Sequence, residues 1–249
     1  MRIRVATMSD IGNYRKSNQD HIDYTRKRNG DFIGIICDGM GGHPHGEVAS
    51  ELAAHTFLKL FKNYNFDGST EEEVLSWLKS TVLKTIKEMQ KHAQIHPETW
   101  DMGTTLAAML ILHEHDKAYV VNIGDSRVYK YVDGNLRQIT TDQNLWNSTA
   151  PQDRAKIQKH HSHDFTYWKI LTSALGPNKS LRIETHVLNK VSGTYVLTTD
   201  GVHDYLEHDD FYDVLKNGKN LKNRVKKLVN MAKANLSTDN LSVLVVEVK

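Results

Sequence analysis

Residues 32–43, FIGIICDGMGGH, join an apolar and β-branched run to a loop that is rich in glycine. The run 32–37 predicts a buried strand, and this strand stops at Asp38. Three of the next four residues are glycines. Glycine lets the backbone turn sharply and approach a ligand closely, although it loses more conformational entropy on folding than other residues do. The stretch therefore predicts a carboxylate held where a buried strand opens into a loop.

Three further aspartates stand in the same kind of position. Like Asp38 after the run 32–37, each lies next to a predicted strand: Asp125 after 118–123, Asp200 after 195–199 and Asp239 before 241–248. Taken alone, each Asp-Gly or Asp-Asn pair is typical of a turn. Three such pairs and the Gly-Asp-Ser-Arg stretch at 124–127, all at the ends of predicted strands, indicate one shared site.

Carboxylates gathered at one edge of a core repel each other, and their pKa values rise unless a cation neutralises them. Cys37 is the only cysteine, and its place inside an apolar strand is typical of a small buried residue. Oxygen ligands without thiolates favour Mg²⁺ or Mn²⁺. Two such ions can share a hydroxide and bind a phosphoryl group.

The composition excludes several classes of protein. The 249 residues carry a net charge of +2, with 39% apolar and 25% charged residues, which is typical of a globular protein and gives no case for a nucleic-acid partner. We find neither an apolar run of about 20 residues that could cross a membrane nor the apolar core of a secretory signal. The single cysteine excludes an internal disulfide and fits the cytoplasm.

Short β-branched runs joined by tight turns favour antiparallel sheets over repeated βαβ units. The predicted strands are 2–7, 32–37, 104–112, 118–123, 128–132, 182–188, 195–199 and 241–248. Three segments, 46–61, 70–95 and 220–235, have apolar residues along one stripe at helical spacing. Each of these helices should therefore lie on the surface of a sheet. Ser69 or Thr70, with Glu72 or Glu73 three residues later, predicts a capping box at the second one.

Residues 142–180, which we call the flap segment, break this pattern. They are polar, predict no strand, and favour one short helix around 152–160. Long irregular insertions in compact domains are often functional. With no repeat and no linker, the chain is expected to form a single domain over 1–249.

Six stretches, in order, resemble the motifs of the PPM family of metal-dependent protein serine/threonine phosphatases (type 2C), in its bacterial branch. They are SDIGNYRKSNQD at 9–20, DGMGGHPHGEVAS at 38–50, GTTL at 103–106, GDSR at 124–127, LTTDGV at 197–202 and DN at 239–240. Any one of them is weak, but the ordered set is specific and spans nearly the whole chain.

The resemblance implies an α+β fold, a four-layer α-β-β-α sandwich of two antiparallel sheets flanked by helices, with a metal cleft at one end. It implies hydrolysis of phosphoserine and phosphothreonine on proteins by a hydroxide that bridges two Mn²⁺ or Mg²⁺ ions, and a third, weaker metal site. Expected partners are phosphoprotein substrates and a bacterial serine/threonine kinase that shares them. We expect a cytoplasmic monomer.

Residue roles follow from the same resemblance. The metal ligands it implies are Asp38, which bridges both catalytic ions, the carbonyl of Gly39 at the second ion, Asp200 and Asp239 at the first, and Asp125 with Asp200 at the third. Arg15 matches the arginine that binds the substrate phosphate, for which its forked donors are suited. Further candidates near the metals are Gln19, Asp20, Asp204 and His43.

Two positions depart from the eukaryotic pattern. Gln19 stands where a glutamate often assists the second metal. Because glutamine is neutral, the second metal site has one negative charge fewer. Met40 stands where eukaryotic members carry a histidine proposed as general acid, although Asp-Gly-Met-Gly-Gly is usual in bacterial members. The proton for the leaving group could then come from metal-bound water or from His43.

Two other functions remain open at this stage. The chain could be a catalytically weak regulatory binder that keeps the fold, although a pure binder has no need of a metal cluster. It could also be a phosphohydrolase that acts on small molecules with the same metals.

Overall fold

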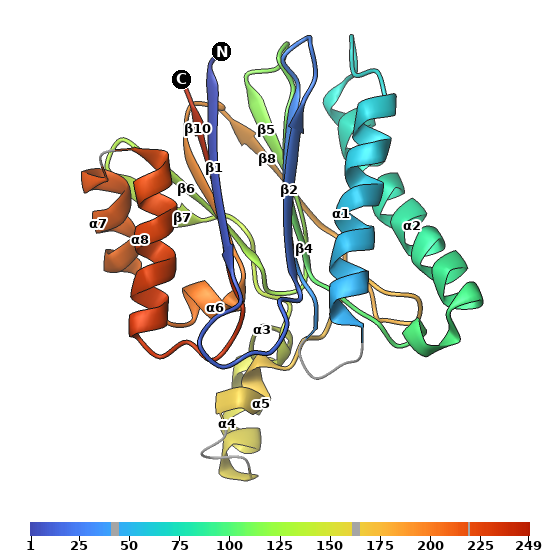
Figure 1. Ribbon diagram of the computed structural model, residues 1–249, viewed down its shortest axis with the longest axis vertical. Coiled ribbons are helices and arrows are strands. Elements are labelled where there is room, and N and C mark those ends of the chain that lie inside the picture. The colour runs from blue at the N-terminus through green and yellow to red at the C-terminus, as the bar shows by residue number, and fades with distance from the viewer. Residues whose placement is uncertain (41–44, 161–164, 219) are drawn as a thin grey trace.

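The computed structural model describes residues 1–40, 45–160, 165–218 and 220–249, which form two antiparallel sheets of five strands each. The sheets pack face to face, with helices on both outer sides (Figure 1). In spatial order, the first sheet consists of β1 (Ile3–Asp10), β10 (Leu241–Val248), β9 (Gly193–Thr198), β6 (Arg127–Val132) and β7 (Asn135–Gln138). The second consists of β2 (Asp20–Arg26), β3 (Phe32–Asp38), β4 (Leu106–Ile111), β5 (Lys117–Ile123) and β8 (Glu184–Asn189).

Two pairs of helices form the outer layers. α1 (Gly46–Asn63) and α2 (Glu71–Ile95) cover the second sheet, and α7 (His208–Asn217) and α8 (Leu221–Ala234) cover the first (Figure 1). The short helices η1 (Pro97–Thr99) and α6 (Asp200–His203) follow α2 and β9 in the chain. The α+β sandwich with the layer order α-β-β-α is therefore confirmed.

Strand β3 shows why the sequence folds in this way. Ile33, Ile35 and Cys37 belong to the core beneath α1 and α2, whereas Phe32 and Ile36 belong to the core between the two sheets. Successive side chains of a strand point to opposite faces, so a strand covered on both sides reads as a continuous apolar run. A third core fills the space between the first sheet and α7 and α8.

The start of α2 confirms the predicted capping box. The Thr70 hydroxyl accepts a hydrogen bond from Glu73 N at 3.3 Å, and Thr70 N donates to the Glu73 carboxylate at 2.8 Å. These bonds satisfy backbone donors that the first turn of a helix leaves without partners.

Among the elements that were not predicted from the sequence are β2 and α7. β2 is an edge strand whose residues are all partly exposed, so its sequence lacks an apolar run. α7 is only ten residues long and begins with acidic side chains. The first predicted strand, 2–7, continues to Asp10 because β1 pairs with β10 along its whole length.

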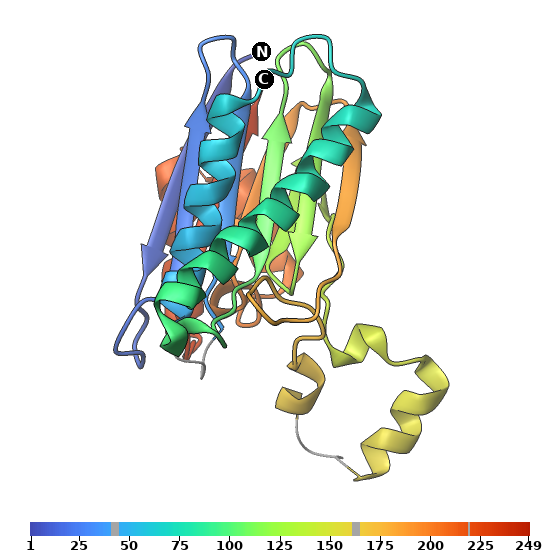
Figure 2. The same ribbon diagram turned by 90° about the vertical axis from the view of Figure 1, so that its right-hand side faces the viewer.

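The described residues of the flap segment, 142–160 and 165–180, include three short helices. They are α3 (Leu145–Ser148), α4 (Pro151–His160) and α5 (Phe165–Lys169). The segment extends beyond the end of the sandwich (Figure 2). α4 corresponds to the helix predicted around 152–160. None of the helices described in this structure combines the length and the hydropathy needed to cross a membrane.

Replacing Ile35 by alanine tests the packing of α1 and α2 on β3. Ile35 is fully buried, so Ile35→Ala should lower the free energy of unfolding by about 2–5 kcal/mol in urea denaturation. Leu83→Ala is the matched control, because Leu83 is 51% exposed on α2 and should cost far less. Equal losses for the two variants would contradict the assigned core.

Candidate metal centre

The predicted aspartates lie close enough together for their charges to affect one another, at positions where strands of both sheets begin or end. They are placed as follows: Asp38 ends β3, Asp125 lies between β5 and β6, Asp200 begins α6 directly after β9, and Asp239 lies two residues before β10. Asp20 begins β2 and pairs with Asp38 across the two strands. Antiparallel pairing thus brings residues that are distant in sequence to the same edge.

The backbone at Asp38 is fixed by the threonine pair that precedes β4. Asp38 N donates to Thr105 Oγ1 at 2.9 Å. The Asp38 carbonyl accepts from Thr104 Oγ1 and from Thr105 N, both at 2.8 Å. The Gly-Thr-Thr stretch therefore holds the carboxylate in place, and it does so from a buried position where water does not compete.

The buried carboxyl groups raise one another's pKa. Burial, together with the charges of Asp20, Asp200, Asp125 and Asp239, raises the pKa of Asp38 well above its ordinary value. Burial raises the pKa of Asp20 to about 7 and that of Asp200 to about 6, with Asp239 contributing to both. A divalent cation among these groups would favour their charged forms.

Two oxygen atoms of this cluster have no partner in the part of the chain that the structure describes. Asp20 Oδ1 and Asp200 Oδ1 are both buried without a hydrogen bond. A buried acceptor without a partner is uncommon and calls for an explanation. Because the donor atoms here are carboxylate and backbone oxygens, the cluster fits hard cations such as Mg²⁺ or Mn²⁺.

Gly39 is packed too closely for any side chain. A Cβ atom on Gly39 would lie 2.3 Å from the carbonyl oxygen of Gly46, at the start of α1. Gly39 N donates to Gln19 O at 3.1 Å, which ties the loop after β3 to the start of β2. Of the loop residues predicted to take part, His43 lies outside the described residues.

Asn240 anchors the loop that carries Arg15, a role that sequence reasoning missed. Its Oδ1 accepts from Gln19 N at 2.9 Å, and its Nδ2 donates to the carbonyls of Ile11 and Ser17 at 2.9 and 3.0 Å. The only sequence signal was the Asp-Asn pair before a strand. Arg15 Nη2 in turn lies 2.6 Å from Asp239 Oδ2. Asn240 thus binds the loop on both sides of Arg15, and Arg15 reaches the neighbouring Asp239.

Glu47, which the sequence analysis did not single out, lies beside Gln19. Gln19 Nε2 donates to Glu47 Oε2 at 2.9 Å, and this hydrogen bond lowers the pKa of Glu47. Glu47 lies in the first turn of α1. It therefore places an ionised carboxylate next to the position where the neutral Gln19 replaces a glutamate.

The flap segment is bound to the same end of the sandwich. Arg127, after the Gly-Asp-Ser stretch, contacts both carboxylate oxygens of Asp142, with Nε–Oδ1 at 2.9 Å and Nη2–Oδ2 at 2.6 Å. Lys169 of α5 lies 2.7 Å from Asp204 Oδ2. Burial, with the charges of Asp200, Asp142 and Asp204, raises the pKa of Asp125 well above its ordinary value, and Arg127 opposes this rise.

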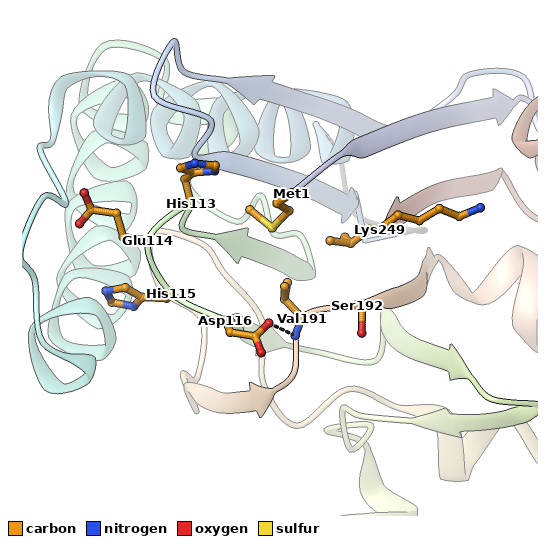
Figure 3. Close-up of a pocket in the computed structure, with 9 residues that line it drawn as sticks. Met1, His113, Glu114, His115, Asp116, Val191, Ser192 and Lys249 are labelled. Carbon is orange, nitrogen blue, oxygen red and sulfur yellow. Dashed lines mark hydrogen bonds between the residues drawn. The ribbon is translucent and has the colours of Figure 1, made fainter.

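A pocket of about 370 Å³ lies at the opposite end of the molecule, near the two termini (Figure 3). His113, His115, Asp116 and Lys249 are among the residues that line it, and none of the predicted site residues does. Figure 3 shows the two histidine rings pointing away from each other. The carboxylate cluster, not this pocket, is therefore the candidate site.

The pKa of Asp20 predicts how the stability of the metal-free protein depends on pH. Its value in the folded chain is about 7, above the ordinary 3.8, so the folded chain holds this proton more tightly than the unfolded chain. The resulting stability is present at low pH and is lost as the pH rises from about 4 through 7. In EDTA, Asp20→Asn should therefore gain stability relative to the natural protein between pH 5 and pH 8.

Denaturant unfolding at the two pH values measures this difference. Asp67→Asn is the control, since Asp67 is exposed, and it should show no such gain. A constant difference between Asp20→Asn and the natural protein across this range would contradict a buried, protonated Asp20.

Comparison with known proteins identifies the family to which the chain belongs. The family model described as "Protein phosphatase 2C" matches residues 14–242. The serine/threonine phosphatase stp of Listeria monocytogenes is 30% identical over 240 residues, which cover 96% of this chain and 93% of that protein. A putative protein phosphatase of Mycoplasma pneumoniae is 28% identical over 98% of this chain and 95% of its own length.

Solved structures give the same result. The serine/threonine phosphatase PstP/Ppp of Mycobacterium tuberculosis is 26% identical, covers 99% of both chains and superimposes with a TM-score of 0.82. The catalytic domain of PstP in complex with two manganese ions, also 26% identical, covers 98% of this chain and 97% of its own with a TM-score of 0.79. By the match of the family model over most of its length, this chain belongs to the protein phosphatase 2C family.

Proposed function

We propose that this protein serine/threonine phosphatase binds two divalent cations through Asp38, Gly39, Asp200 and Asp239, and that it hydrolyses phosphoserine and phosphothreonine on proteins at that site. The observation that carries the proposal is the cluster of buried aspartates with raised pKa values and two oxygens without partners. The two manganese ions bound to the PstP catalytic domain support the same number of cations here.

Each carboxylate has a separate role in this proposal. Asp38 pairs with Asp20 across β2 and β3, and it is close enough to Asp200 for that charge to raise its pKa, so it is suited to bridge two cations. Asp200 and Asp239 complete one cation site, and the Gly39 carbonyl contributes to the other. Asp125 with Asp200 would bind a third cation, near Asp204. When bound, the cations supply Lewis acidity toward the phosphoryl oxygens and activate water.

Arg15 is proposed to bind the substrate phosphate. Its guanidinium already holds one carboxylate oxygen, Asp239 Oδ2, and a phosphate oxygen offers an equivalent charge-assisted hydrogen bond. Asn240 holds the Arg15 loop at the edge of the cluster, so the guanidinium is kept within reach of a phosphoryl group bound there. Arg15 would stabilise negative charge on the phosphoryl oxygens as it develops.

Neither Met40 nor Cys37 supplies a proton or a nucleophile in this scheme. Methionine has no acidic proton. The Cys37 thiol is fully buried, and burial raises its pKa, which disfavours the thiolate. Hydrolysis therefore needs no covalent intermediate on the chain.

The substrates and setting follow from the activity. The proposed substrates are phosphoproteins. We propose that a serine/threonine kinase phosphorylates the same proteins that this enzyme dephosphorylates. A free, buried cysteine fits the reducing cytoplasm, where we place this activity.

Replacing Asp38 by asparagine tests the cation site. The amide keeps the size of the side chain but loses its charge, so Asp38→Asn should abolish hydrolysis of p-nitrophenyl phosphate and of phosphopeptides while the protein stays folded. Asp67→Asn, on the exposed surface, is the matched control and should keep normal rates. Excess EDTA should silence the natural enzyme, and Mn²⁺ should restore it. Metal-independent turnover, or normal rates in Asp38→Asn, would overturn the proposal.

Replacing Arg15 tests the phosphate contact. A hydrogen bond to a charged group contributes about 1.5–3 kcal/mol, so Arg15→Ala should lower kcat/KM on a phosphopeptide by about 10- to 150-fold. Arg15→Lys keeps the positive charge but loses the forked donors of the guanidinium. Its kcat/KM should therefore lie between those of Arg15→Ala and the natural protein. Arg28→Ala, on an exposed turn, is the control. An unchanged kcat/KM in Arg15→Ala would remove Arg15 from the site.

A further inference from the structure

A second group of potential metal ligands lies away from the carboxylate cluster, between β2 and α1. His21 and Asp23 are two residues apart on β2, so their side chains lie on the same face of the strand. Their partners on β3 are Cys37 and Ile35, which belong to the core beneath α1. His21 and Asp23 therefore face the helical layer rather than the other sheet.

His55 approaches the same place from the helix. α1 packs on β2, the edge strand of its sheet (Figure 1). One ligand atom of His21, one of Asp23 and one of His55 lie within 4.8 Å of one another. The two imidazole rings meet nearly edge to face, with centroids 5.6 Å apart and planes at 63°. Three ligand atoms from two different elements thus converge on one small volume.

A fourth potential ligand lies one turn earlier on the helix. Glu51 and His55 are four residues apart, so they occupy the same side of α1. Glu51 Oε1 lies 3.8 Å from His55 Nδ1, which is too far for a hydrogen bond. After rotation of its side chain, Glu51 could bind the same ion as His55. Both side chains are about 60% exposed, which leaves an open path for an ion.

Hydrogen bonds do not account for the placement of the two imidazole groups. Across residues 1–40, 45–160, 165–218 and 220–249, neither the His21 nor the His55 ring makes a hydrogen bond to the protein. The backbone N–H of Tyr24 donates to Asp23 Oδ1 at 2.7 Å, which leaves the second carboxylate oxygen for another partner. The group is therefore not explained by internal hydrogen bonding.

We propose that His21, Asp23 and His55, with Glu51 alongside, form a separate site for a zinc-class transition metal ion that braces α1 against the edge of the second sheet. Two imidazoles and a carboxylate are ligands that Zn²⁺ prefers, whereas Mg²⁺ prefers oxygen alone. The proposal goes beyond the phosphatase activity and does not depend on it. Because β2 begins with Asp20 and α1 carries Glu47, the bound ion would join two elements that border the carboxylate cluster.

Zn²⁺ binding to the full chain in excess Mg²⁺ tests the site. Mg²⁺ occupies the all-oxygen cluster, and equilibrium dialysis then counts the Zn²⁺ bound to the natural protein, to His21→Ala and to His55→Ala. We expect the natural protein to bind one more Zn²⁺ than either variant, with an affinity at least about 100-fold higher than theirs, since removal of even an outer partner of a metal ligand costs 10- to 100-fold. Zn²⁺ should also raise the midpoint of thermal unfolding of the natural protein and not that of His55→Ala.

His92→Ala is the matched control. His92 in the last turn of α2 and His96, the residue after this helix, form another close pair of rings, with centroids 4.7 Å apart. This control should bind Zn²⁺ as the natural protein does. His55 is exposed, so His55→Ala should fold normally and hydrolyse phosphopeptides with Mg²⁺ at the natural rate. Equal Zn²⁺ binding by the natural protein and both variants, no Zn²⁺ binding in excess Mg²⁺, or loss of the same ion in His92→Ala would each overturn the proposal.

Discussion

Mutual repulsion among buried carboxylates at one end of the sandwich is the constraint on which the rest of this structure depends. Asp20, Asp38 and Asp200 are largely desolvated; the charges of Asp20 and Asp200 oppose ionisation of Asp38, and the charge of Asp200 opposes that of Asp20. Without a cation the cluster holds protons that isolated aspartates would release at neutral pH. With divalent cations the same groups become ligands, so the site couples metal binding to the charge state of the core.

The fold supplies this cluster by topology rather than by local sequence. Asp20 and Asp38 face each other because β2 and β3 form an antiparallel pair, and Asp200 and Asp239 lie just after β9 and just before β10, which are neighbouring strands of the other sheet. Close packing then fixes the loops between them. Gly12 has φ of 84°, and a Cβ there would lie 2.2 Å from Asp239 O, so the Arg15 loop passes directly over the end of β10. Rigid strands thus hold the carboxylates, while loops carry the groups that meet a substrate.

Much of the fold could be predicted from the sequence, because its strands are buried. The apolar run of β3 and the one-sided stripes of α1, α2 and α8 follow directly from the faces that they bury. β2 was missed because an edge strand with partly exposed side chains has no apolar run. The four aspartates at strand ends were visible as a pattern, whereas the division of roles among them came from the family resemblance. Asn240, Glu47 and Lys169 were not found, since their contacts join segments far apart in sequence. The His21 and His55 pair was hidden for the same reason.

Anomalous diffraction from a crystal soaked in Mn²⁺ is the measurement that tests the central claim most directly. The account predicts two neighbouring manganese peaks that share Asp38, with Asp200 and Asp239 at one of them and the Gly39 carbonyl at the other. Manganese bound elsewhere on the chain, with Asp38, Asp200 and Asp239 left uncoordinated, would contradict it.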